Sequence, residues 1–202
     1  MTAPPRWDLV AVIGTKGPFP RLLDAVLAWA RAHPGARVWV QHGESPLPAG
    51  LEGAERVPRD VLVGHLADAA AVVIHAGTGT IRDALALGHR PVVVARRAAL
   101  GEHVNDHQAE IAAALGARIV ACPHPEDAGA FERALNEARL GRAAAGTVAS
   151  LPGAELRAAL RERFLAAAPS RRAPMVWRAL AALTRSVVVR RRGPLDGRPP
   201  GQ

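Results

Sequence analysis

Cysteine, aromatic residues and lysine are scarce in this sequence. Cys122 is the only cysteine among the 202 residues, which excludes an internal disulfide and a cysteine-rich metal site and makes a reducing compartment the simplest expectation. Three phenylalanines, four tryptophans and no tyrosine leave few side chains for stacking on nucleic-acid bases. Lys16 is the only lysine. We therefore expect neither a disulfide scaffold nor a nucleic-acid partner.

Long apolar runs and a targeting signal are also missing. No uncharged apolar stretch is long enough to span a bilayer. Residues 1–7 include two prolines and show no basic start followed by an apolar stretch of signal-peptide type. We therefore expect a cytoplasmic protein that is neither exported nor threaded through a membrane.

The positive charge is unevenly distributed. The net charge is +8, but residues 1–149 contain 15 basic and 15 acidic side chains, so the excess lies in residues 150–202, where 11 arginines face three acidic residues. A neutral body with a basic end favours an attachment device over a nucleic-acid surface. We expect a domain at 1–149 and a helical, arginine-rich, partly disordered extension at 150–202. This extension either reaches an anionic membrane surface or a partner, or packs back on the body.

Short apolar runs alternate with helical patterns in the first 149 residues. The expected strands are 8–13, 36–41, 71–74, 91–95 and 118–122, with a weaker one near 55–57. The expected helices are 18–32, 60–69 with Asp60 as N-cap, 80–87, 106–115 with Asp106 as N-cap, and 125–138. A connector at 139–152 and two helices of the extension, 155–167 and 173–189, follow. This alternation predicts an α/β fold with a doubly wound, Rossmann-like parallel sheet.

Turns rich in glycine and threonine follow two of the expected strands. In His75-Ala76-Gly77-Thr78-Gly79-Thr80, glycines admit a ligand to the main chain, and hydroxyls and helix N-terminal amides suit phosphate oxygens. Gly14-Thr15-Lys16-Gly17 occupies the equivalent turn after the first strand. The carboxyl ends of parallel strands share one rim, so the two turns predict a grip on a diphosphate from both sides. An ordinary strand-to-helix turn is the alternative for each, and the spacing of a P-loop is absent.

The loop after the strand 91–95 is dense in polar groups. It contains Arg96, Arg97, Glu102, His103, Asn105, Asp106, His107 and Gln108. His103 and His107 are four residues apart, but the run lacks the HExxH order of a zinc protease. We therefore expect no metal site here.

Three segments in a fixed order resemble the C-terminal domain of glycosyltransferase family 28. They are VIGTKGPF, HAGTGTIRDALALGHRPVVV and GEHVNDHQAEIAAAL, within residues 9–135. Within this family the chain looks most like stand-alone donor-binding subunits: the soluble subunit that adds the second N-acetylglucosamine to dolichol-linked sugar, and bacterial exopolysaccharide glucuronosyltransferase subunits. The resemblance implies one half of a GT-B enzyme, a UDP-sugar donor and inversion at the sugar carbon, with no cofactor.

The resemblance also implies roles by position. Asp83 aligns with the acid that holds the ribose diol, although the peptidoglycan enzyme of the family has the longer Glu; an exposed helical acid beside Arg82 is the alternative. Apart from the resemblance, Arg96 and Arg97 directly follow the strand 91–95 and should therefore lie at the rim. One of them would pair with a uronic carboxylate, which favours UDP-glucuronate, or with the diphosphate or Glu102. The expected donor-binding set is Gly14, Thr15, Lys16, His75, Gly77, Thr78, Gly79, Thr80, Asp83, Arg96, Asp106, His107 and Gln108.

The acceptor-binding half of a GT-B enzyme is absent from the sequence, so a membrane-anchored acceptor-binding subunit is the expected partner. His75 is the local candidate for the catalytic base, and the partner is the alternative source. The expected function is that of the catalytic, UDP-sugar-binding subunit of a two-component inverting glycosyltransferase. It would transfer glucuronate or N-acetylglucosamine to a lipid-linked saccharide at the inner face of the membrane. The alternatives are a non-catalytic basic nucleic-acid-binding α/β protein and a nucleotide-sugar epimerase-like enzyme.

Overall fold

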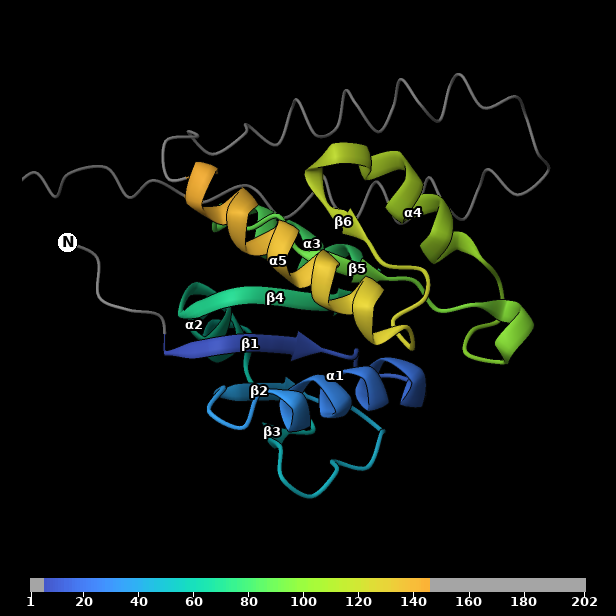
Figure 1. Cartoon of the computed structure of the whole chain (residues 1–202). Helices are drawn as coiled ribbons and strands as arrows, with labels where there is room; N and C mark the ends of the chain where they lie inside the picture. Colours follow the sequence, from blue (N-terminus) through green and yellow to red (C-terminus); the bar gives the residue numbers. More distant parts are fainter. Residues whose placement is uncertain (1–5, 146–202) are drawn as a thin grey trace, which may run out of the picture.

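A six-stranded parallel sheet with helices on both faces forms the fold (Figure 1). The computed structural model describes residues 6–145. The elements are β1 (Trp7–Val12), α1 (Pro20–Ala32), β2 (Val38–Gln41), β3 (Glu52–Ala54), α2 (Arg59–Ala67), β4 (Ala69–His75), α3 (Thr78–Ala86), β5 (Val92–Val94), η1 (Ala98–Leu100), α4 (His107–Leu115), η2 (Gly116–Arg118), β6 (Val120–Ala121) and α5 (Ala128–Ala145). The predicted α/β, doubly wound class is confirmed; the helices and disorder expected in the extension lie outside the described residues.

The strand order is β3-β2-β1-β4-β5-β6. From β1 the chain builds outward through β2 and β3, then returns to the other side of β1 and builds β4, β5 and β6. β1 therefore pairs with both β2 and β4, with Leu9 opposite Val38 on one side and Ala71 on the other. In open parallel sheets this reversal of direction opens a crevice beyond the carboxyl ends of the two strands where it occurs. The equivalent position here, which we call the crevice, lies beyond β1 and β4.

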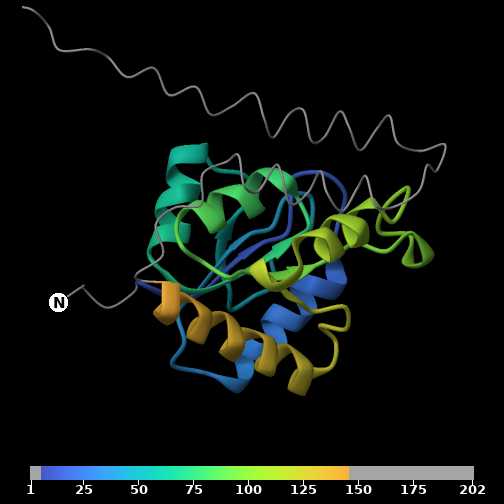
Figure 2. The ribbon, with the colours of Figure 1, turned by 90° about the horizontal axis from the view of Figure 1, so that it is seen from above.

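Successive side chains of β1 enter two separate cores. Leu9 and Ala11 pack with residues of α1 and α5, whereas Val10 and Val12 pack with residues of α2, α3 and α4. Figure 2 shows α1 and α5 together on one side of the sheet and α2 and α3 on the other. A strand covered on both faces needs apolar residues at every position. This explains why the strands read as continuous apolar runs.

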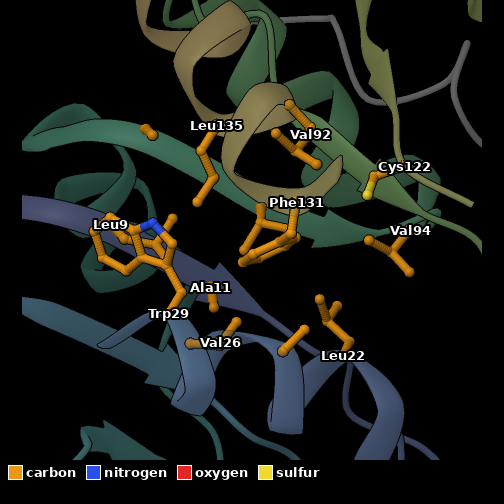
Figure 3. Packing of buried hydrophobic residues seen from close by; sticks show 14 of the residues in the cluster. Leu9, Ala11, Leu22, Val26, Trp29, Val92, Val94, Cys122, Phe131 and Leu135 are labelled. Atoms are coloured by element: carbon orange, nitrogen blue, oxygen red, sulfur yellow. The ribbon is translucent and has the colours of Figure 1, made fainter. Parts of the chain in front are cut away.

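Phe131 of α5 lies in the middle of the first core. Its side chain is fully buried, and Figure 3 shows it between Leu22 and Val26 of α1 and Val92 and Val94 of β5. One aromatic ring thus joins two helices and the sheet. A large aromatic ring buries more apolar surface than an aliphatic side chain, so we expect Phe131 to contribute strongly to the attachment of α5.

Several predicted boundaries are wrong, among them those of β3, α2 and α5. β3 is Glu52–Ala54 rather than residues 55–57. In this strand the backbone at Gly53 lies so close to β2 that a Cβ there would be 2.2 Å from the carbonyl oxygen of Val40. Glycine, normally a strand breaker, is required there. α2 begins at Arg59 with Pro58 as N-cap, so Asp60 lies in the first turn.

The third wrong boundary is the end of α5. This helix continues to Ala145, so the first part of the expected connector at 139–152 is helical. The run of alanines there has the highest intrinsic helix propensity and outweighs Gly141 within the same helix. Within residues 6–145, no helix combines the length and the apolar character needed to cross a bilayer.

Candidate functional site

The crevice beyond β1 and β4 is built around the imidazole of His75, the last residue of β4. The ring packs between Gly14 and Gly77: a Cβ on Gly14 would lie 3.1 Å from Nε2, and one on Gly77 only 2.3 Å from it. Both glycines of the two predicted turns therefore make room for this ring. These turns were predicted to lie on one rim of the sheet, and in the structure both contact the His75 ring.

Burial strongly perturbs the protonation of His75. Burial lowers its pKa to about 4, the hydrogen bond to Val12 opposes the change, and the positive charges of Arg96 and His103 add to it. The ring is thus neutral at neutral pH. Nδ1 lies 3.2 Å from the carbonyl oxygen of Val12, which can only accept, so Nδ1 carries the proton and Nε2 keeps its lone pair. The histidine presents a hydrogen-bond acceptor between the two turns.

Unpaired main-chain amides flank His75 on both sides. α3 begins at Thr78 after the N-cap Gly77, with no side-chain cap. The amides of residues 78–80 make no hydrogen bond to other described residues, as the first turn of a helix leaves them. The same holds for residues 14–16 in the first turn. Two sets of N–H groups therefore stand at one rim, which is an arrangement that suits the oxygens of a diphosphate.

Asp83, the expected ribose ligand, is buried on α3 and already paired. Its Oδ1 lies 2.7 Å from Nη2 of Arg59, its Oδ2 lies 3.0 Å from Nε of the same residue, and Arg82 adds a contact at 3.2 Å. The alternative prediction, an exposed helical acid beside Arg82, is wrong because Asp83 is buried. Arg82 is a neighbour of Asp83, as that alternative expected. The Arg59 side chain is 69% exposed, so a ligand can replace it at the surface.

The side chains of Arg96 and Gln108 form hydrogen bonds with the main chain of the protein. Arg96 is 2% exposed, and its guanidinium donates to four main-chain carbonyls. Oε1 of Gln108 accepts the main-chain N–H of Arg96 at 3.0 Å. This differs from the expected direct contact of Arg96 with the donor, because the end of β5 turns its side chain inward under the first turn. Arg97, the next residue, is exposed.

The other polar residues of this loop are only partly where they were expected. Asp106 is the residue before α4, but its carboxylate accepts the N–H of Ala98 at 2.8 Å and makes no cap bond to α4. Nδ1 of His107 forms a hydrogen bond with the side-chain oxygen of Asn105. The centres of the His107 and His103 rings are 4.6 Å apart, and the rings pack edge to face. Burial and the charge of His103 lower the pKa of His107. No third ligand completes a metal cluster with these two histidines among residues 6–145.

Arg21 of α1 fastens the same loop through Glu102. The two side chains form a fork at 2.7 and 2.9 Å, and Arg21 also donates to the carbonyl oxygens of Ala95 and Pro123. Burial alone would raise the pKa of the Glu102 carboxyl, but the hydrogen bonds from Arg21 and from the Arg97 N–H and the nearby positive charges lower it overall. Glu102 was expected as a polar loop residue and as an alternative partner of Arg96 or Arg97, whereas its ion-pair partner in the structure is Arg21, which was not predicted.

We expect Glu102→Gln to lose about 1.5–3 kcal/mol of stability at pH 7, the contribution of hydrogen bonds to a buried charge. Because the folded-state pKa is lowered, this contribution is present above the unfolded-state pKa and is lost as the pH falls through the folded-state value. Urea unfolding at pH 7 and at decreasing acid pH measures the difference from wild type, which should shrink towards low pH. Glu126→Gln is the matched control, since its carboxylate faces the same arginine at 3.6 Å but is 52% exposed. Equal losses in both variants, or a pH-independent loss, would contradict this expectation.

Two cavities lie away from the crevice. One of about 620 Å³ is at the amino edge of the sheet, beside Arg6, Arg31, Arg37 and Glu52. The other, of about 420 Å³, follows β6 and has the buried Cys122 thiol in its wall. Burial raises the pKa of this thiol, which keeps it protonated and unreactive. Neither cavity touches the groups around His75.

The middle of the chain resembles a known protein family. Residues 59–125 match the Glycosyltransferase family 28 C-terminal domain. The matched segment contains Asp83, the turn after β4 and the whole loop from β5 to α4. Among curated proteins, none matches the chain.

Three solved structures that resemble the chain are glycosyltransferases of the GT-B fold. The glycotransferase of kitacinnamycin is 20% identical with a TM-score of 0.50, over 80% of this chain and 41% of that one. The calicheamicin glycosyltransferase CalG4 is 20% identical (TM-score 0.47; 89% and 45% covered), and SnogD from Streptomyces nogalater is 21% identical (TM-score 0.40; 80% and 44% covered). The first likeness shows the fold. The chain spans less than half the length of each of these proteins.

Proposed function

We propose that this chain is the catalytic, donor-binding subunit of a two-component inverting glycosyltransferase that uses a UDP-sugar. The observation that carries the proposal is the gathering at one rim of two sets of unpaired amides, on either side of His75. His75 and the second set, at the start of α3, lie within the segment that matches family 28. The amides of the first turn and of the start of α3 bind the two phosphates, and Lys16 adds the positive charge. Asp83 holds the ribose diol after Arg59 releases it.

The reaction is a direct displacement at the sugar carbon. The acceptor hydroxyl attacks, the bond to UDP breaks, and the amides and Lys16 stabilise the charge that develops on the departing diphosphate. His75 is the local candidate for the base. Its pKa of about 4 makes it weak in the free protein, but a bound diphosphate next to Nε2 favours the protonated form and raises that pKa. A base on the partner is the alternative.

The acceptor and its partner subunit complete the proposal. The described residues form a single sheet with one donor-binding rim, and in this proposal the acceptor, a lipid-linked saccharide, is bound by a membrane-anchored subunit. Leu100 and Val104, in the loop next to the crevice, are 53% and 88% exposed, and apolar side chains of this kind suit a neighbouring protein or lipid. The transferred sugar is glucuronate or N-acetylglucosamine, and exposed Arg97 favours the charged one. In this proposal the protein works in the cytoplasm, at the inner face of the membrane, and the basic extension at 150–202 assists there.

We expect UDP to stabilise the protein against heat and Asp83→Asn to weaken UDP binding by roughly 10- to 100-fold, the equivalent of about 1.5–3 kcal/mol for charge-assisted hydrogen bonds. Thermal shift and calorimetric titration with UDP, ADP and GDP measure both effects. Asp60→Asn is the control, because this acid lies in the first turn of α2 and is exposed. Arg59→Ala separates the two roles of Asp83, since it frees the carboxylate and should not weaken UDP binding. No response to UDP, or an equal response to the three nucleotides, would overturn the donor assignment.

A further inference from the structure

Arg96 bonds to the main chain of the turn that follows β1. Its Nη2 donates to the carbonyl oxygens of Ile13 at 3.1 Å and Gly17 at 2.9 Å, and its Nη1 to that of Pro18 at 2.7 Å. A weaker bond from Nη1 reaches the carbonyl oxygen of Glu102 at 3.3 Å. Three of the four bonds therefore hold one short turn, from a position 78 residues or more away in the sequence.

The guanidinium is fixed from other directions as well. Its Cζ lies 4.6 Å from the centre of the Phe19 ring, and the Arg96 main-chain N–H is held by Gln108. Burial lowers the pKa of Arg96, although the charges of Glu102 and Glu44 oppose the change. A buried charge whose partners are mostly neutral carbonyls is an expensive way to stabilise a loop. Its advantage is directional, since a planar fork fixes several acceptors at once.

The direction of these bonds determines where the amides of the turn point. The carbonyl of Ile13 and the N–H of Gly14 belong to one peptide plane and point to opposite sides. Because Arg96 draws the carbonyl inward, the N–H of Gly14 points away from the buried guanidinium, and it has no partner among the described residues. The same turn already binds one oxyanion: the N–H of Gly17 donates to Oε2 of Glu44 at 2.9 Å.

From this geometry we propose that Arg96 is a positioning residue, which orients the first turn so that its amides and Lys16 meet the donor diphosphate while Arg96 itself stays out of contact with the donor. The inference rests on the proposed function. Arg96 then acts on the part of the site that binds phosphate, and on neither the sugar nor the ribose. Substitution of Arg96 should therefore affect the binding of phosphate and leave the nucleoside part unchanged.

The test compares UDP with uridine, titrated into the full chain and followed by amide resonances. Arg96→Lys keeps the charge but cannot bridge several carbonyls, and we expect it to weaken UDP at least about tenfold while uridine stays within about twofold. The control is Arg90→Lys at the other end of β5, where Arg90 also donates to a carbonyl, that of Ala117 at 2.8 Å. Phe19→Leu is a second variant, which replaces the ring beside Arg96 with a smaller apolar side chain in the first core and should show the same selectivity. In a double-mutant cycle, Lys16→Ala should cost less in the Arg96→Lys background than in wild type.

The possible outcomes are distinct. Selective loss of UDP affinity in the Arg96 and Phe19 variants, with Arg90→Lys unchanged, supports the positioning role. Equal loss of UDP and uridine together with a lower melting temperature shows that Arg96 is only structural, and undiminished UDP binding shows that it is dispensable; each overturns the inference. A wild-type protein that binds uridine but not UDP, or neither, contradicts the proposed function and the inference with it.

Discussion

Phe131→Ala is expected to lower the free energy of unfolding by about 3–5 kcal/mol, the range for removing a buried phenylalanine. The ring is 1% exposed and lies between α1, α5 and the sheet (Figure 3). Its loss leaves a cavity that three elements would have to move to fill. Because single domains are stable by only about 5–15 kcal/mol, this one change removes a large part of the total. Chemical denaturation at equilibrium measures it.

Leu140→Ala is the matched control for this experiment. Leu140 belongs to the same helix, α5, but its side chain is 72% exposed. We expect a change within about 0.5 kcal/mol, as for other surface substitutions. The comparison separates the packing of Phe131 from any change in the helix propensity of α5. Similar losses in both variants would show that α5 is not anchored through its aromatic ring.

Gly43→Ala is expected to cost about 2–5 kcal/mol and to weaken UDP binding. Gly43 follows β2 and has a φ of +54°, and a Cβ there would lie 2.1 Å from the carbonyl oxygen of Gly14. The substitution combines left-handed strain of about 1–2 kcal/mol with overpacking of about 1–3 kcal/mol. The atom that must move is backbone of the first turn, so the damage reaches the amides proposed to bind phosphate.

Gly50→Ala isolates the contribution of the clash. This glycine also has a positive φ, +95°, but a Cβ on it would meet nothing within 4 Å. We expect it to cost only the conformational strain, about 1–2 kcal/mol, and to leave UDP binding unchanged. Thermal unfolding and UDP titration of both variants test this. If the two glycines behaved alike, the close contact between the loops after β1 and β2 would have no role in the site.

The sequence predicted the strands well because of how they are buried. Residues such as Leu9 and Val10 face different cores, yet both must be apolar, so each central strand is visible as an uninterrupted run. The edge strand β3 has no such signal. Glycine is required at position 53 because the backbone lies close to Val40 of the neighbouring strand. Such a contact depends on tertiary structure and cannot be predicted from local strand propensity.

The candidate site was predictable as far as it depends on local turns. Gly14 and Gly77 were recognised as turn residues, but their shared role of enclosing the His75 ring depends on the β1–β4 pairing. The ion pairs between distant residues could not be predicted from the sequence. Arg21 meets Glu102 across 81 residues and Arg59 meets Asp83 across 24, and no periodicity links such positions. Arg96 was expected to face the ligand because it follows a strand, but its direction is set by carbonyls of a distant turn.

The pairing of β1 with β4 has a consequence for the order of folding. These two central strands are neighbours in space, but nearly sixty residues of chain separate them, and closing a loop of that size has an entropic cost that grows with its length. β1, β2 and β3 can associate earlier through shorter connections, but without α3, α4 and α5 the two apolar faces of β1 are only partly covered. A parallel sheet with such non-local pairing folds slowly compared with local topologies. During synthesis the nascent chain can complete its centre only after β4 has left the ribosome, and the crevice around His75 is created in that same step.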